Sequence, residues 1–523
     1  MTVDGPPLGR VLMVQGTSSD AGKSTLVAAL CRVFARAGLR VAPFKAQNMS
    51  NNAAVTDDGG EIGRAQAAQA LAAGIAPTVD MNPVLLKPQG DRTSQVVVLG
   101  RALHVADARA YYARKAELWP VVTGALDRLR AAYDLVVAEG AGSPAEINLA
   151  QYDIVNMRVA RHSGAPVLLV GDIDRGGVFA SLYGTVALLP PEERAHVRGF
   201  VINKFRGDPT LLTPGFAMLE ARTGVPTLGV LPYLDLSRVP AEDALDLDAR
   251  GGFGATPRGA GGADAVLDVV VLRLPRIANL DEFQPLAAEL GVRLRFVRSP
   301  EEVGAPDLVI VPGTKATRAD LAWVRERGLD AAVCARRAAG TPVLGICGGY
   351  QMLGVTVADP FGTEGVAGEA PGLGLLPVRT TFAPDKVTER VSARAAAATA
   401  LWPADGAGAA PLAAYEIHMG RTEPCAGAPP GRAPFAVAGR DGRVADDGAA
   451  SDDGLVVGTY LHGLLENGAF RRALLERLAA RRGVRLPDAT AGPPADPFDA
   501  LAAAVREHLD LAAVARLVDL PAP

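Results

Sequence analysis

Short apolar segments that alternate with helical patterns constrain the fold of this 523-residue chain more than any other feature. Repeated strand-then-helix units are typical of βαβ folds, in which the strands form a parallel sheet covered on both faces. The pattern predicts an α/β protein with two doubly wound domains. The expected strands of the first domain lie at 11–15, 39–44, 134–138, 166–170 and 198–203, and those of the second at 267–272, 292–297, 307–311 and 342–346.

A glycine-rich stretch with little apolar content, GGFGATPRGAGGA, separates the two runs of strands and is typical of a linker. We therefore expect a first domain over residues 1–235, a linker over 236–265 and a second domain over 266–470. The remaining residues, 471–523, carry helical patterns and are predicted to form a helical C-terminal extension. A chain of this length has enough residues for a core in each domain.

Charge and cysteine content argue against several classes of protein. The 53 basic and 57 acidic residues give a net charge of −4, which does not indicate a nucleic-acid partner. The start MTVDGPPLGR has no basic region followed by an apolar one, and no run of about 18 apolar residues predicts a membrane span. None of the four cysteines forms a C-x-x-C pair, so neither a zinc site nor a disulfide framework is indicated. We expect a cytoplasmic protein without a membrane or nucleic-acid partner.

The loop GTSSDAGKST at 16–25 follows the first expected strand and opens a helix. Backbone N–H groups in such a turn can hold phosphate oxygens, Lys23 can neutralise them, and the hydroxyl of Ser24 or Thr25 can bind Mg²⁺. The spacing departs from G-x-x-x-x-G-K-[ST] because the first glycine stands one place too early. The alternative is a glycine-rich turn with a surface lysine. The predicted ATP-binding residues are Thr17, Gly22, Lys23, Ser24 and Thr25.

Two further strand ends support a nucleotide site. DLVVAEGAGS brings Glu139 to the carboxyl edge of the sheet, where a carboxylate can hold Mg²⁺ together with Ser24. The alternative for Glu139 is an ion pair with a neighbouring lysine. VINKF ends with Asn203, whose amide can bind an adenine edge. The polar segments 45–64 and 87–95 are candidates either for lining a site for a large polar substrate or for solvated loops.

The second glycine-rich turn, GICGG at 345–349, has the G-x-nucleophile-x-G pattern of a strand-to-helix elbow. The turn exposes Cys347 and brings the next backbone N–H, that of Gly348, to where an oxyanion forms. Gly313, in the PGT that follows the strand at 307–311, offers a second N–H donor. Cysteine is also a common small core residue, but a core cysteine does not need two flanking glycines.

A cysteine nucleophile needs a base, and two histidines of the second domain are candidates. His418 lies in AAYEIHMGRT, and His462 follows the apolar segment VVGTYL at an expected sheet edge. His462 is therefore the better candidate. A single histidine is more often structural than catalytic, and the elbow cysteine is what favours catalysis here.

The second domain resembles the class I glutamine amidotransferases, which implies a flavodoxin-like fold, and GICGGYQMLG is the strongest motif of this resemblance. That superfamily usually carries His-x-Glu, with the glutamate orienting the imidazole. Here Leu464 stands two residues after His462, so the third triad member is missing from its usual place. This departure resembles the branch that amidates cobyrinic acid, which works with a Cys–His pair.

The first domain resembles the dethiobiotin-synthetase-like ATPases, including their off-register phosphate loop. The combination over about residues 10–470 is similar to the cobyric acid synthases, a family of glutamine-dependent ligases of cobalamin biosynthesis. The motifs that carry this resemblance are QGTSSDAGKST, FKAQNMSNNA, EGAGSPAEINL, GDIDRGG, PGTK, YEIHMG and GTYLHG.

The resemblance implies a division of labour. Cys347 attacks the side-chain amide of glutamine, His462 moves protons, and the amides of Gly313 and Gly348 hold the oxyanion. ATP and Mg²⁺ convert a corrin carboxylate to an acyl phosphate, and ammonia that travels internally displaces the phosphate. The family's substrate is adenosyl-cobyrinic acid a,c-diamide, amidated at its b, d, e and g side chains.

Two alternatives remain. One is another glutamine-dependent amidoligase, such as a cobyrinate a,c-diamide synthase, although FKAQNMSNNA favours the cobyric acid branch. The other is a non-enzyme, a P-loop partitioning-type ATPase with a vestigial second domain. Against it, Ser18 stands where those ATPases carry a lysine early in the loop.

Overall fold

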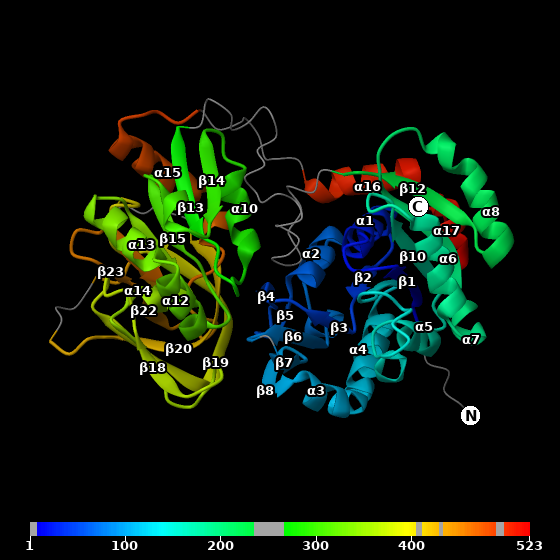
Figure 1. The fold of residues 1–523 in the computed structure, drawn as a ribbon, viewed down its shortest axis with the longest axis horizontal. Helices are drawn as coiled ribbons and strands as arrows, with labels where there is room; N and C mark the ends of the chain where they lie inside the picture. Colours follow the sequence, from blue (N-terminus) through cyan, green and yellow to red (C-terminus); the bar gives the residue numbers. More distant parts are fainter. Residues whose placement is uncertain (1–7, 91, 235–265, 404–410, 428–431, 488–495) are drawn as a thin grey trace.

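The computed structural model describes residues 8–90, 92–234, 266–403, 411–427, 432–487 and 496–523. The whole of the predicted linker, 236–265, lies outside them. Figure 1 shows the first domain, coloured from blue through cyan to blue-green, beside the second domain in green, yellow and orange. Among the described residues, no helix combines the length and the apolar composition needed to cross a membrane.

Six parallel strands form the main sheet of the first domain, in the order β12-β11-β10-β1-β9-β2. Their side chains alternate between two cores, because Leu12 and Val14 face one side of the sheet while Val11 and Met13 face the other. The five predicted strands are confirmed, and β12 is an addition. The bounds are β1 Arg10–Gly16, β2 Val41–Phe44, β9 Leu135–Glu139, β10 Val167–Asp172, β11 Val197–Phe205 and β12 Thr227–Pro232.

Helices cover both faces of this sheet (Figure 1). One face packs against α4 Trp119–Ala132, α5 Met157–Ser163, α6 Val178–Leu188 and α8 Thr213–Thr223. The other face packs against α1 Lys23–Arg36, which opens directly after the phosphate loop. The short helices α3 Ala108–Arg114 and α7 Pro191–Arg194 lie between these elements in the chain.

Residues 47–107 add a smaller layer to the first domain. A four-stranded sheet has the order β3-β6-β7-β8, β4 pairs with β5, and helix α2 Arg64–Ala72 follows. The polar segments 45–64 and 87–95, which the sequence assigned either to a substrate site or to solvated loops, lie here. Many of their polar side chains are buried. The strands are β3 Gln47–Met49, β4 Ala53–Val55, β5 Glu61–Gly63, β6 Val84–Pro88, β7 Thr93–Val98 and β8 Arg101–Asp107.

The main sheet of the second domain has the order β14-β13-β15-β16-β24-β23, parallel except for β23. The four predicted strands are confirmed to within one residue. The strands are β13 Leu267–Leu272, β14 Val292–Val297, β15 Leu308–Val311, β16 Val343–Ile346, β23 Ala449–Ala450 and β24 Val456–Thr459. The helices are α10 Gln284–Ala287, α11 Pro300–Val303, α12 Thr317–Glu326, α13 Leu329–Ala338 and α14 Gly348–Leu353.

A mixed sheet that the sequence did not predict packs on the second domain. Its centre is the long antiparallel pair β19 Val378–Ala395 and β20 Leu412–Pro424. The other strands are β17 Thr356–Asp359, β18 Gly368–Pro371, β21 Phe435–Ala438 and β22 Val444–Asp447.

The C-terminal extension is helical, as predicted, and it divides between the two domains. Helix α15 Gly468–Arg482 contributes Leu474 and Leu478 to the core of the second domain. The predicted end of that domain at residue 470 therefore falls inside this helix. Helices α16 Pro497–His508 and α17 Leu511–Leu517 return to the first domain (Figure 1), where α16 packs on α1 and both contribute to the same hydrophobic core.

Candidate active site

Cys347 occupies a strained turn between β16 and α14. Its φ of 51° lies in the left-handed region, which a non-glycine residue rarely adopts. The turn is held by the Cys347 N–H, which donates to the Thr459 carbonyl at 2.8 Å. Gly349 is required by close packing, because a Cβ there would lie 1.8 Å from the Val311 carbonyl oxygen. The predicted strand–turn–helix elbow is therefore present.

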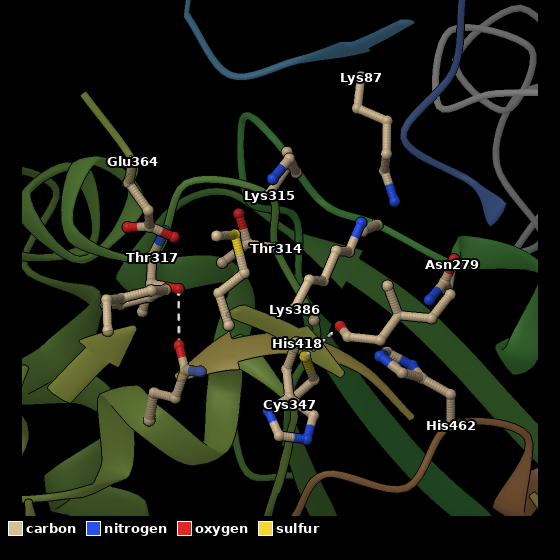
Figure 2. A pocket seen from close by; sticks show the side chains of 16 residues that line it. Lys87, Asn279, Thr314, Lys315, Thr317, Cys347, Glu364, Lys386, His418 and His462 are labelled. Atoms are coloured by element: carbon tan, nitrogen blue, oxygen red, sulfur yellow. Dashed lines mark hydrogen bonds between the residues drawn. The ribbon is translucent and has the colours of Figure 1, made fainter. Parts of the chain in front are cut away.

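The elbow opens into a cavity that also contains Gly313 and His462 (Figure 2). His462 follows β24 and is 1% exposed. A Cβ on Gly313 would lie 3.0 Å from the Cε1 of His462, so a glycine lets the imidazole lie against this turn. Gly348 faces the same turn, since its Cβ would lie 2.7 Å from the Cγ2 of Thr314. The four residues predicted for the glutamine half thus come together.

Glu282 supplies the carboxylate that the sequence lacked two residues after His462. Its two carboxylate oxygens lie 3.3 and 3.4 Å from the Nδ1 of His462, and both side chains are buried. Burial alone would lower the pKa of the imidazole, but Glu282 and the neighbouring Cys347 outweigh it and raise the pKa to about 10. The only sequence signal was the pair of adjacent acids in NLDEF, soon after strand β13.

The surroundings of the imidazole extend into the first domain. The ring of Tyr415 stacks on His462 with 5.3 Å between centroids, and the two residues exchange backbone hydrogen bonds of 3.2 and 2.9 Å. Arg64, the first residue of α2, donates to the Tyr415 hydroxyl at 3.2 Å and forms a buried ion pair with Asp281 at 2.5 Å. Asp281 directly precedes Glu282, so a residue of the first domain supports this turn.

A second contact between the domains fixes the same turn. The Ala53 N–H donates to the Asn279 side chain at 3.0 Å, and the Leu280 N–H donates to the Asn52 side chain at 3.2 Å. Asn279 itself has a φ of 53° and lines the cavity. Part of the polar segment 45–64 is therefore an interface between domains.

His418, the other candidate base, lines the same cavity. Its Nδ1 lies 2.9 Å from the Gly420 carbonyl, and its ring stacks on Tyr460 at 3.8 Å. Among the described residues, the one carboxylate within 4 Å of its ring nitrogens is that of Glu416, at 3.5 Å from Nε2. His462, with Glu282 on one nitrogen and Cys347 beside it, is the better base.

The predicted phosphate loop surrounds the ammonium group of Lys23. Its Nζ donates to the carbonyls of Ser18 at 2.8 Å and Gly142 at 3.2 Å, and the side chain is buried, so the surface-lysine alternative is wrong. Gly22 has a φ of 99°, which a residue with a side chain rarely adopts. Thr17 anchors the start of the loop through its N–H, 2.9 Å from the Val170 carbonyl. Thr25 follows Ser24 in the first turn of α1 and is partly exposed.

Glu139 lies at the end of β9, directly beside this loop. The Ser24 hydroxyl donates to one of its oxygens at 2.8 Å, Lys45 pairs with the same oxygen at 2.7 Å, and Gln69 donates to the other at 2.6 Å. The lysine partner that the sequence offered as the alternative is therefore present, and the role of Glu139 as a Mg²⁺ ligand stays a prediction. An adjacent hydroxyl and carboxylate are the oxygen donors that fit Mg²⁺. No group of three or more His, Cys, Asp or Glu side chains in the described residues could hold a metal.

Asn203 lies under the phosphate loop. Its amide nitrogen donates to the Ala21 carbonyl at 2.9 Å, and a Cβ on Gly22 would lie 1.9 Å from it. The side chain therefore braces the loop in this structure, and its predicted contact with adenine is not tested by this arrangement.

Comparisons with known proteins agree with this division into two sites. Residues 12–245 match the CobQ/CobB/MinD/ParA nucleotide binding domain, and residues 268–470 match the CobB/CobQ-like glutamine amidotransferase domain. Among curated relatives, the cobyric acid synthase of Sorangium cellulosum is 56% identical, with 97% of this chain and 98% of the relative covered. Those of Desulforudis audaxviator and Klebsiella pneumoniae are 52% and 50% identical, covering 97% and 95% of this chain and 96% of each relative.

Identity at this level over nearly the whole length, with both domain families in the expected order, goes far beyond a shared fold. The chain belongs to the cobyric acid synthase family.

Proposed function

We propose that this chain uses ATP and glutamine to amidate the b, d, e and g carboxylates of adenosyl-cobyrinic acid a,c-diamide, which yields adenosyl-cobyric acid. The names of its relatives and the two domain families support this reaction. The observation that carries the chemistry is the buried arrangement of Cys347, His462 and Glu282 at one end of a cavity.

In the glutamine half, the sulfur of Cys347 attacks the side-chain amide carbon and its proton passes to His462. Glu282 holds the Nδ1 side of the imidazole and so stabilises the protonated ring. The N–H groups of Gly313 and Gly348 hold the oxyanion. His462 then gives its proton to the departing nitrogen, the C–N bond breaks, and water hydrolyses the glutamyl thioester.

In the ligase half, the loop around Gly22 and Lys23 holds the phosphates of ATP while a corrin carboxylate attacks the terminal phosphorus and ADP leaves. A carboxylate is a poor electrophile, and the resulting acyl phosphate is a good one. Ammonia from the second domain adds to its carbonyl carbon and phosphate leaves. Ser24 and Glu139 would hold Mg²⁺, which would neutralise charge on the phosphates. Adenine binding by Asn203 is part of the proposal.

The test is amidation of adenosyl-cobyrinic acid a,c-diamide by the full chain with ATP and glutamine, followed by mass spectrometry. We expect four amides per corrin, and Cys347→Ala should add them only with ammonium salts. Two amides added to cobyrinic acid instead would support the a,c-diamide synthase alternative. ATP hydrolysis with no change in any corrin mass would contradict the assigned substrate.

A further inference from the structure

Three lysines from separate parts of the chain direct their ammonium groups into the cavity that contains Cys347 (Figure 2). Lys87 belongs to β6 of the first domain, Lys315 follows β15, and Lys386 lies on β19 of the mixed sheet. Glutamine hydrolysis by Cys347, His462 and Glu282 uses none of these three lysines. Buried or half-buried cations are costly unless an anion accompanies them, so this grouping needs a chemical reason.

One carboxylate of the first domain serves two of these lysines. Glu61 accepts a hydrogen bond from Lys87 at 2.5 Å and another from Lys386, and its side chain is 1% exposed. Burial would raise the pKa of Glu61, but Lys386 and Lys87 lower it well below its usual value. Glu61 is therefore an anion whose two oxygens are both engaged.

Lys315 remains without such a partner. Among the described residues, its ammonium group has no hydrogen bond and no ion pair within 4 Å. Burial and the two neighbouring lysines lower its pKa to about 7. The other acid in the cavity, Glu364, accepts the N–H groups of Thr317 and Arg318 at 2.9 and 3.2 Å. The cavity and its wall thus set three lysines against two carboxylates, Glu61 and Glu364.

We infer that this cationic end of the cavity is the subsite for the α-carboxylate of glutamine, with Lys315 as the main contact and Lys386 and Lys87 beside it. The inference rests on the proposed function, because it assumes that glutamine presents its amide to Cys347. The carboxylate carbon of extended glutamine is about 5 Å from its amide carbon by standard bond lengths. A single cavity lined by both Cys347 and the lysines can therefore receive the two ends of one molecule.

The chemistry of the subsite matches a carboxylate closely. An anion between the ammonium groups would supply the missing charge, and hydrogen bonds from ammonium to carboxylate are about twice as strong as neutral ones. Glu364 lies in the same cavity and can accept the α-ammonium group of the same ligand. Because Lys87 comes from the first domain, the subsite is complete only when the two domains are together.

The first experiment measures glutamine hydrolysis and ammonium-supported amidation by the full chain in Lys315→Met and Lys315→Arg variants. We expect Lys315→Met to raise the KM for glutamine about 10- to 100-fold, the range for losing one charge-assisted hydrogen bond. The kcat should change less, Lys315→Arg should recover part of the loss, and amidation with ammonium should be unchanged. That last rate also reports that the variant is folded. Lys115→Met, a lysine of the first domain outside the cavity, is the matched control.

Two probes separate a carboxylate subsite from a merely structural lysine. The glutamine analogue 4-aminobutanamide lacks the carboxylate, so its hydrolysis should be slow and Lys315→Met should not slow it further. Iodoacetate is an anion and iodoacetamide is neutral, so the ratio of their alkylation rates at Cys347 should fall in Lys315→Met.

The inference would be overturned if Lys315→Met left the KM for glutamine unchanged. It would also be overturned if this substitution slowed hydrolysis of 4-aminobutanamide as much as that of glutamine. Normal glutamate formation with fewer amides formed per glutamate would overturn it as well, because the lysines would then line the route of ammonia. Hydrolysis and alkylation need no corrin, so these results stand apart from a failure of the proposed substrate.

Discussion

The two glycine-rich turns of this chain build sites of different kinds. Around Lys23 and Glu139, the hydrogen bonds join residues of the first domain, among them Ser18, Ser24 and Gln69. The cavity at Cys347 instead takes residues from both domains, with Lys87 in its lining and Arg64 supporting its wall. The phosphate loop is therefore held by residues of the first domain, whereas the glutamine site takes residues from both domains.

Helix α2 joins these two sites. Arg64 at its first position contacts Tyr415 and Asp281, and Gln69, five residues later, holds the second oxygen of Glu139. Five residues of helix span about 7.5 Å, so one rigid turn and a half touches both centres. A single short helix thus links the phosphate site of the first domain to the glutamine site between the domains.

Substitution of Cys347 should cause the largest loss of activity and should affect only the glutamine site. Cys347→Ala removes the nucleophile and should lower glutamine-dependent amidation at least about 1,000-fold, as for nucleophile losses in other enzymes. Amidation with ammonium should continue, because the proposed ligase chemistry at Lys23 and Glu139 does not use the thiol of Cys347. Parallel assays with glutamine and with ammonium at pH 8.5 measure both. Loss of the ammonium-dependent rate as well would show that the sites are not separable in this way.

Substitution of Lys23 tests the phosphate site in the same way. Lys23→Met removes the cation at the centre of the phosphate loop and should lower ATP-dependent amidation about 100-fold or more, with either nitrogen source. Glutamine hydrolysis measured without ATP should stay within about twofold of the wild type. Circular dichroism and thermal unfolding control for folding, because Lys23 is buried and bonds two carbonyls. A large fall in basal hydrolysis would mean that the glutamine site depends on this loop.

Glu282→Gln tests the carboxylate that the sequence lacked at position 464. The carboxylate favours the protonated imidazole of His462, whose pKa is raised to about 10, so removing its charge lowers that pKa. We expect kcat for glutamine hydrolysis to fall about 10- to 1,000-fold. The high-pH limb of the kcat/KM profile should move to lower pH, since the imidazolium then loses its proton earlier.

The matched control for this change is Glu289→Gln, an acid of the same domain whose partner is Arg471 at 2.7 Å. It should leave the pH profile unchanged. A Glu282→Gln enzyme with a lower rate and an unshifted profile would assign Glu282 a packing role only.

The sequence predicted the parts of this molecule that are local. The predicted strands 267–272 and 292–297 match the structure residue for residue, because LDVVVL is rich in β-branched residues and VRLRFV begins with alternating apolar and charged residues. The elbow and the phosphate loop were visible because their glycines and reactive side chains are adjacent in the chain.

What the sequence did not reveal depends on distant partners. Strand β19 runs for 18 residues through several charged positions, and its length is set by pairing with β20. Glu282 and His462 are 180 residues apart, so no spacing rule relates them. The interface role of Asn52 likewise exists only after the domains meet. Local chemistry was predictable, and the residues that connect elements were not.

Substitution of Arg64, at the start of α2, tests whether this helix couples the two sites. Arg64→Met removes the partner of buried Asp281 without touching the cavity, so the turn that carries Glu282 loses a support. We expect glutamine hydrolysis to fall about 3- to 10-fold, with ammonium-dependent amidation unchanged.

The further measurement is the rate of glutamine hydrolysis with and without a non-hydrolysable ATP analogue. If α2 couples the sites, the analogue should change hydrolysis in the wild type and Arg64→Met should abolish that response. Gln69→Leu, which alters the other end of the same helix, should abolish it too. A response that survives both substitutions would assign coupling to another route, and no response in the wild type would leave α2 as a static brace.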